Sequence, residues 1–161
     1  MNKTYLLSLW ELFVGSNWQW ETAPQTTGAG IVVVRKFKNW KYLGLWAYGG
    51  FDIPKGHVES GDDIFETATR ETKEEAGIDE LNFNWGREYI RIDNLFVYIA
   101  STEQDFNINF NKEENIFEHE FAKWLNYDEM YKKTYDYLRP AINWKKKNGE
   151  LDEDSWIMLK S

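Results

Sequence analysis

The order of predicted strands and helices is consistent with a single α/β domain. The chain has 161 residues, the usual size of one domain, and 42% of them are hydrophobic, which is enough for one core. The β-branched run over residues 30–34 predicts a strand, and residues 62–76, which contain neither Gly nor Pro, predict a helix. No internal repeat or low-complexity linker divides the chain, so we expect one domain over residues 1–161.

Further elements follow from the pattern of apolar and turn residues. Residues 41–46 are a weaker strand candidate, and the pair Gly49 and Gly50 breaks the chain after them. Strands are also expected over residues 83–92, 95–100 and 121–125. A second helix is expected from residue 128 to about residue 147, with an interruption at Pro140 because proline cannot continue a helical ladder.

The helix predicted over residues 62–76 has a consistent start, buried face and end. Ser60 can cap the first turn, where Asp62 and Asp63 place negative charge at the positive end of the helix dipole. Gly77 is expected to end the helix as a C-cap. The residues at spacings of three and four that should form its buried stripe are Phe65, Ala68, Thr72 and Ala76.

Composition limits both the chemistry and the partners. The chain has no cysteine, which excludes disulfides, zinc thiolates and thiol nucleophiles. No run approaches the roughly 20 apolar residues that span a bilayer, so we expect a soluble, cytoplasmic protein without a membrane partner. The formal net charge of −8 disfavours long nucleic acids, whereas a small polyanion bridged by divalent cations fits an acidic protein.

Three glutamates share one arc of the predicted helix. Glu71, Glu74 and Glu75 are three and four residues apart, and at about 100° per residue these offsets return to nearly the same face. A divalent cation would relieve their repulsion, and Mg²⁺ suits such oxygen ligands and is commonly shared with substrate phosphates. Arg70 precedes Glu74 by four residues and can fix one carboxylate. The alternative interpretation is an ordinary charged helical face.

Residues 56–78 resemble the Nudix box, whose pattern is G-x5-E-x7-R-E-U-x-E-E-x-G-U, with U an apolar residue. The chain departs from this pattern at Asp62, where the family has Glu, and at Thr72, where it usually has an aliphatic residue. Residues 53–59, 70–72 and 118–125 are similar to the asymmetrical diadenosine tetraphosphate hydrolases, a subgroup in which Thr72 fits. The positions that match the box by identity are Gly56, Arg70, Glu71, Glu74, Glu75 and Gly77.

This resemblance implies a Nudix-type α/β/α sandwich with a mixed central sheet, the box helix on one side and the C-terminal helix on the other. It implies Mg²⁺-dependent hydrolysis of a phosphoanhydride bond in a small nucleotide, with diadenosine tetraphosphate cut to ATP and AMP, and Mn²⁺ as a substitute cofactor. The enzymatic alternatives are removal of pyrophosphate from an RNA 5′ end and hydrolysis of another nucleoside diphosphate derivative. The alternative of another class is a nucleotide-sensing module that does not cut its ligand.

The resemblance also implies roles for individual residues. Mg²⁺ would be bound by Glu71, Glu74, Glu75 and Glu118, with a backbone carbonyl at or beside Gly56. Glu71 or Glu118 would orient or deprotonate the attacking water. Arg70 would act with these catalytic residues by fixing a carboxylate.

Substrate contacts are expected on both sides of Gly56 and on the later strands. Lys55 and His57 flank Gly56 in an expected turn, where an ammonium and an imidazole could meet phosphate oxygens; the alternative is two exposed turn residues. Tyr89 is the candidate for stacking on a base, although burial is the commoner fate of aromatic residues. His119 is interpreted as a structural or supporting residue. Residues 101–117 are expected to form a substrate-facing loop or an extra hairpin.

Overall fold

The centre of the structure is a mixed sheet of seven strands. The computed structural model describes residues 27–108 and 119–151. The sheet order is β3-β2-β1-β6-β5, with β4 paired to β1 and β7 paired to β2. β1 and β6 run parallel, and the other strand pairs are antiparallel. The strands are β1 (Gly28–Lys36), β2 (Trp40–Ala47), β3 (Gly50–Asp52), β4 (Lys55–His57), β5 (Ile90–Ile92), β6 (Leu95–Ser101) and β7 (Phe121–Leu125).

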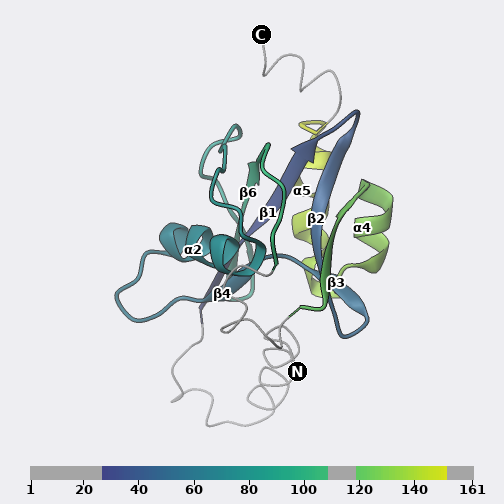
Figure 1. Ribbon diagram of the computed structural model, residues 1–161. Helices are drawn as coiled ribbons and strands as arrows, with labels where there is room; N and C mark the ends of the chain where they lie inside the picture. Colours follow the sequence, from purple (N-terminus) through teal and green to yellow (C-terminus); the bar gives the residue numbers. More distant parts are fainter. Residues whose placement is uncertain (1–26, 109–118, 152–161) are drawn as a thin grey trace.

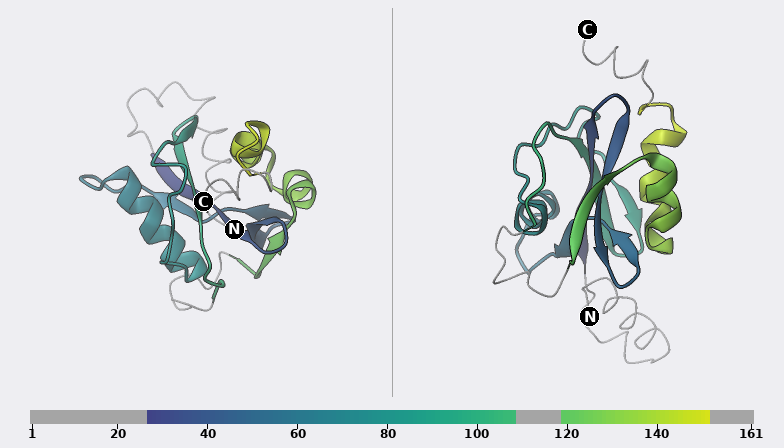
Figure 2. Two further views of the ribbon diagram at one scale, coloured as in Figure 1. Left: turned by 90° about the horizontal axis from the view of Figure 1, so that it is seen from above. Right: turned by 45° about the vertical axis from the view of Figure 1, so that its right-hand side comes forward.

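Helices cover both faces of this sheet (Figure 1, Figure 2). The helix α2 (Ile64–Ala76) lies on one face, while α4 (Tyr127–Lys133), η2 (Asp136–Leu138) and α5 (Arg139–Lys147) lie on the other. This arrangement confirms the expected α/β/α sandwich.

The β1 strand explains why two apolar layers can form. Ile31 and Val33 belong to the core on the α2 side, whereas Val32 and Val34 belong to the core on the α4 and α5 side. Successive side chains of a strand point to opposite faces, so a strand covered on both faces requires an unbroken apolar run. Residues 30–34 supply that run.

The start of α2 differs from expectation. The helix begins at Ile64, so Asp62 and Asp63, which were expected in its first turn, precede the first helical residue. The N-cap is Asp63, whose carboxylate accepts a hydrogen bond from the Glu66 N–H at 3.0 Å, so the expected cap at Ser60 is wrong. Asp63 immediately precedes the first helical residue, which puts its short side chain within reach of the free N–H groups. Gly77 ends the helix in the left-handed conformation at φ 69°, as expected.

The expected strand over residues 83–92 is largely wrong. Only Ile90–Ile92 forms a strand, and the residues before it turn at Gly86, which has φ 83° and whose N–H donates to the Phe83 carbonyl at 3.0 Å. The apolar Phe83 packs on Phe65 of α2, with ring centroids 4.8 Å apart. An apolar residue here therefore reflects packing against the helix and not strand pairing.

The expected second helix is interrupted before Pro140. The break lies at Thr134 and Tyr135, where the Thr134 hydroxyl and the Tyr135 N–H both donate to the Phe51 carbonyl, at 3.0 and 3.1 Å. Pro140 instead lies in the first turn of α5, where its missing N–H would have had no helical partner. The interruption is thus set by a tertiary contact with β3.

No helix within residues 27–108 and 119–151 has the length and apolar character needed to cross a membrane. The cytoplasmic location and the extent of one domain over residues 1–161 stay predictions. Of the expected loop or hairpin over residues 101–117, residues 109–117 lie outside the described part of the chain.

Candidate active site

The candidate site begins where α2 touches β4. Gly56 pairs with Ala29 of β1, and this pairing sets the Gly56 backbone beneath α2. A Cβ atom at Gly56 would lie 2.1 Å from Cδ and 2.2 Å from Oε1 of Glu71. No side chain fits there, so glycine at this position lets a carboxylate reach the backbone of β4.

The three glutamates of α2 differ in exposure. The side chains of Glu71 and Glu75 are 6% and 1% exposed, whereas that of Glu74 is 27% exposed. Glu71 and Glu75 are therefore buried between the helix and the sheet, and Glu74 lies nearer the solvent. A buried carboxylate loses hydration and needs a cation or hydrogen-bond donors in its place.

Arg70 binds the outer side of this carboxylate group. Its guanidinium lies 3.4 Å from Glu71, 3.5 Å from Glu74 and 3.8 Å from Asp62. The expected contact of Arg70 with a carboxylate is confirmed, whereas its part in catalysis stays a prediction. Asp62, which replaces the usual glutamate of the box, contributes its charge to Arg70. Thr72 is fully buried, and its hydroxyl is satisfied by the Ala68 carbonyl at 2.8 Å.

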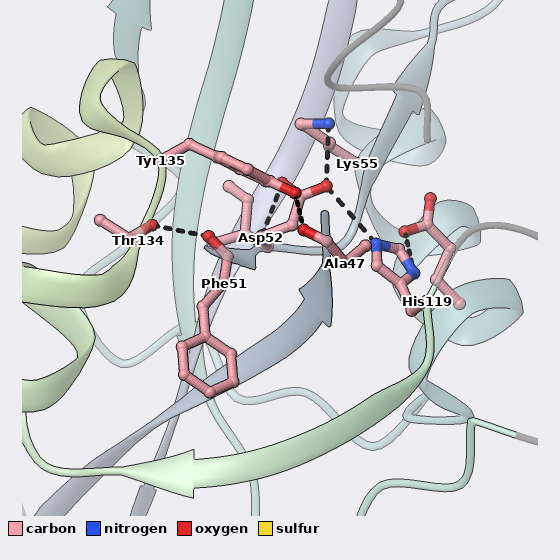
Figure 3. A network of polar contacts seen from close by, with 9 residues as sticks. Ala47, Phe51, Asp52, Lys55, His119, Thr134 and Tyr135 are labelled. Atoms are coloured by element: carbon pink, nitrogen blue, oxygen red, sulfur yellow. Dashed lines mark hydrogen bonds and ion pairs between the residues drawn. The ribbon is translucent and has the colours of Figure 1, made fainter. Parts of the chain in front are cut away.

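On the inner side, Glu75 contacts His119, which belongs to a buried polar network with Asp52 and Lys55. Figure 3 shows His119, Asp52 and Lys55 side by side. The Glu75 Oε2 atom lies 3.8 Å from Nδ1 of His119, and Nε2 of the same ring lies 3.4 Å from Oδ2 of Asp52. The Lys55 ammonium donates to that Asp52 oxygen at 3.2 Å. The importance of Asp52 was not predicted; the only signal in the sequence is its position three residues before Lys55.

Lys55 and His57 are strand residues, not turn residues. Lys55 is 2% exposed, and although burial by itself lowers the pKa of its ammonium, the nearby Asp52, Tyr137 and Glu75 raise that pKa above its ordinary value overall. His57 is half-buried at the end of β4. Phosphate binding by either residue stays a prediction. In the structure the Lys55 ammonium is paired with the buried carboxylate of Asp52.

The site has a surplus of negative charge. Five carboxylates against two fixed cations leave a formal charge of −3 when His119 is neutral. Within residues 27–108 and 119–151, no group of three His, Cys, Asp or Glu side chains is arranged to hold a metal ion by itself. Hard oxygen donors and surplus negative charge fit Mg²⁺, which usually takes only one or two carboxylates and completes its shell with waters and phosphates. The expected ligand Glu118 lies outside the described residues.

An aromatic groove of about 640 Å³ lies between the β2–β3 turn and the connection from α4 to α5. Tyr135 and Tyr137 stack there with their planes 12° apart and centroids 6.4 Å apart. The Tyr135 hydroxyl donates to the Ala47 carbonyl, which ties this wall to β2. The groove was not predicted from the sequence. The residues that line it include Tyr48, Lys132, Lys133, Tyr135, Tyr137 and Arg139.

The groove and the carboxylates are linked through β3. The connection that lines the groove donates two hydrogen bonds to the Phe51 carbonyl, and the next residue, Asp52, belongs to the network that reaches Glu75 (Figure 3). Tyr137 is also close enough to act on the charge of Lys55. The groove is therefore joined to the carboxylate site through β3.

Tyr89 lies in a different aromatic cluster. Its ring is 50% exposed and packs edge-on against Phe96 and Tyr98, with centroids 5.1 and 5.8 Å away. Phe96 and Tyr98 belong to β6, which pairs with β1 along the edge opposite β4. Base stacking by Tyr89 stays a prediction.

Comparisons with known proteins agree with this geometry. The family model described as the NUDIX domain matches residues 22–145. The chain is 34% identical over 89 residues to the asymmetrical bis(5′-nucleosyl)-tetraphosphatase of Sus scrofa, covering 47% of this chain and 55% of that protein. It is 32% identical over 114 residues to Nudix hydrolase 10 of Arabidopsis thaliana, covering 66% of this chain and 39% of that protein. The chain thus spans about half the length of these curated relatives, or less.

Among solved structures, the chain is similar to a C. elegans Ap4A hydrolase in a binary complex. The two share 27% sequence identity with a TM-score of 0.61. The match covers 78% of this chain and 98% of the other.

Proposed function

Because the chain belongs to the NUDIX domain family, we propose that it hydrolyses a phosphoanhydride bond in a nucleoside polyphosphate, with diadenosine tetraphosphate cut to ATP and AMP. The observation that carries the proposal is the pair of buried carboxylates, Glu71 and Glu75, one of which lies against the backbone of Gly56. The similarity to the pig tetraphosphatase and the C. elegans Ap4A hydrolase supports the choice of substrate.

Mg²⁺, with Mn²⁺ as a substitute, would be held by Glu71, Glu74 and Glu75 together with the Gly56 carbonyl and Glu118. When bound, the ion neutralises charge on the phosphate oxygens and aligns the phosphate chain for attack. The surplus of buried carboxylate at the site supports this assignment.

Glu71 is the described residue best placed to orient the attacking water or to accept its proton. Its carboxylate is buried, so few other waters compete for it, and Arg70 at 3.4 Å fixes its orientation. Arg70 also holds Glu74 at 3.5 Å, which limits the movement of both carboxylates.

The aromatic groove would receive one nucleoside. Its volume of about 640 Å³ falls within the usual range for ligand pockets, and the tyrosine rings offer flat surfaces for a base. Lys132, Lys133 and Arg139 line the same groove and would attract the phosphate chain of the ligand. The groove adjoins β3, whose last residue, Asp52, belongs to the network that reaches Glu75, and we expect the phosphates to extend along this side of the sheet toward the carboxylates.

The test is product analysis after incubation with diadenosine tetraphosphate and Mg²⁺, beside triphosphorylated RNA, ADP-ribose and ATP. We expect ATP and AMP from diadenosine tetraphosphate, with loss of both in Glu75→Gln and retention in the exposed control Glu80→Gln. Turnover of RNA or ADP-ribose alone would support hydrolysis of a phosphoanhydride bond but would contradict diadenosine tetraphosphate as the substrate. Binding of nucleotide without turnover of any compound would favour a sensing module.

A further inference from the structure

We propose that His119 and Asp52 are positioning residues for the metal-binding carboxylate of Glu75, with Lys55 as the buried counter-ion that holds Asp52 in place. The proposal rests on the proposed function, because it assigns Glu75 to the divalent cation. It explains why the side chains of Asp52, Lys55 and His119, from three different segments, lie together (Figure 3) and are only 2%, 2% and 6% exposed.

The His119 ring lies between two carboxylates. Its Nε2 atom is 3.4 Å from Oδ2 of Asp52, and its Nδ1 atom is 3.8 Å from Oε2 of Glu75. The His119 side chain is 6% exposed, so the ring has little room to turn away from either partner. An imidazole has one nitrogen on each side, and here each nitrogen faces a different carboxylate.

Asp52 is fixed at both of its oxygens. Oδ1 accepts a hydrogen bond from the Ile53 N–H at 2.8 Å, while Oδ2 accepts one from the Lys55 ammonium at 3.2 Å. Asp52 and Lys55 are each 2% exposed, and a buried charge that loses its partner is strongly destabilising. Neither side chain can therefore move outward without a large cost, which makes Asp52 a rigid support for the His119 ring.

The order Lys55, Asp52, His119, Glu75 joins β4, the end of β3, the segment before β7, and α2. Partners of this kind orient a metal-binding side chain, and their loss typically weakens metal affinity by about 10- to 100-fold. Lys55 contributes as a counter-ion within the protein.

The first test measures Mn²⁺ binding to the purified protein by electron paramagnetic resonance, without nucleotide. We expect His119→Ala and Asp52→Asn to weaken Mn²⁺ binding by about 10-fold or more. His119→Asn, which keeps an amide N–H near the position of Nδ1, should recover part of the lost affinity. Equal loss in His119→Ala and His119→Asn would contradict a positioning contact from the ring to Glu75.

A matched control is Lys145→Gln. Lys145 of α5 is also buried, and it pairs with Glu88 and Glu150, each at 3.3 Å, on the opposite face of the sheet from α2. Its replacement removes a buried lysine pair outside the site and should lower the melting temperature without changing Mn²⁺ affinity. Weaker Mn²⁺ binding in this control would show that lost stability alone explains the effect and would overturn the proposal.

The second test uses steady-state kinetics to distinguish an effect on metal binding from an effect on nucleotide binding. For Asp52→Asn we expect a shift of about 10-fold in the Mg²⁺ concentration for half-maximal rate, with the KM for diadenosine tetraphosphate near that of the parent protein. Saturating Mg²⁺ should restore most of kcat. A raised KM with an unchanged Mg²⁺ dependence would overturn the proposal.

The two proposals fail in different ways. If the parent protein binds Mn²⁺ and both variants weaken it, but no nucleotide is cut, the proposed function is wrong and the positioning role stands. The opposite outcome has two parts: the parent protein cuts diadenosine tetraphosphate, and the variants His119→Ala and Asp52→Asn bind Mn²⁺ as tightly as the parent does. If circular dichroism shows that both variants are folded, this outcome means that the positioning role is wrong and the function stands.

Discussion

The carboxylate of Glu71 lies against the α-carbon of Gly56, so closely that a Cβ atom at Gly56 would be 2.1 Å from Glu71 Cδ. This contact brings the box helix and β4 into one site. A buried carboxylate can approach a peptide backbone in this way only where no side chain intervenes. Several consequences can be measured.

Replacing Gly56 by alanine should remove activity and reduce stability. The new methyl group overlaps the Glu71 carboxylate, which must shift or push α2 away from β4. We expect a cost of about 1–3 kcal/mol in the free energy of unfolding and a loss of turnover of about 100-fold. Denaturant unfolding and initial rates measure both. Gly86→Ala is the control. Gly86 has a positive φ, so alanine is strained there, but no atom lies within 4 Å of the added Cβ, and this variant should retain activity.

Replacing Glu71 by glutamine should leave the stability of the metal-free protein unchanged or higher but reduce its stabilisation by Mg²⁺. The variant removes one of the two buried carboxylates of α2, so its melting temperature in EDTA should equal or exceed that of the parent protein. Mg²⁺ at about 100 times its Kd should stabilise the parent by about 2.7 kcal/mol and should stabilise the variant much less. Thermal unfolding with and without Mg²⁺ measures this. An equal response to Mg²⁺ in both proteins would remove Glu71 from the metal site.

Replacing Tyr48 by glycine should weaken substrate binding without loss of stability. Tyr48 is 50% exposed beside the aromatic groove and has φ 52°, a conformation that costs a residue with a side chain roughly 1–2 kcal/mol. Glycine relieves this strain but removes the ring, so we expect KM to rise about tenfold with kcat retained. Asp93→Gly is the control, because Asp93 also has a positive φ, at 51°, and lies outside the groove lining. A raised KM in both variants would argue against a role for the Tyr48 ring.

Replacing Tyr42 by phenylalanine should reduce the loss of stability at alkaline pH. Burial, with a smaller contribution from Tyr127, raises the pKa of the Tyr42 hydroxyl above its ordinary value of 10.0. The folded state therefore binds this proton more tightly than the unfolded state. The resulting stability is complete below the ordinary pKa and is lost as pH rises above it.

The comparison is between free energies of unfolding at about pH 8 and about pH 11 for Tyr42→Phe and the parent. Among the described residues the Tyr42 hydroxyl has no hydrogen-bond partner, so the variant should be no less stable at about pH 8. Tyr131→Phe, at an exposed tyrosine, is the control and should follow the parent. An alkaline loss in Tyr42→Phe as large as in the parent would assign the pH dependence to other groups.

Local pattern was a reliable guide where one element decides its own structure. The apolar run of β1, the spacing of the α2 residues and Gly77 as its stop are set by periodicity and by the conformational freedom of glycine, and all three were confirmed. The Arg70 contact with Glu74 follows from a spacing of four within one helix, and it was also confirmed.

Local pattern was wrong where a distant residue decides. Residues 83–89 are apolar enough for a strand, but Phe83 packs on α2 and Gly86 turns the chain. The second helix breaks at Thr134 because the Thr134 hydroxyl donates a hydrogen bond to the carbonyl of Phe51, which is far away in sequence. In each case the residue that changes the local structure belongs to another helix or strand, so the neighbouring sequence does not reveal it.

The family, the sandwich fold and the carboxylate helix could be predicted from the sequence, because they depend on residues at fixed spacing within one motif. The folded structure was needed to show which carboxylates are buried, that Lys55 is paired with Asp52, and that His119 lies beside Glu75. It also decided where the aromatic groove lies. These features join β3, β4, α2, the segment before β7 and the α4–α5 connection, and burial and pairing between separate segments arise only when the chain has folded.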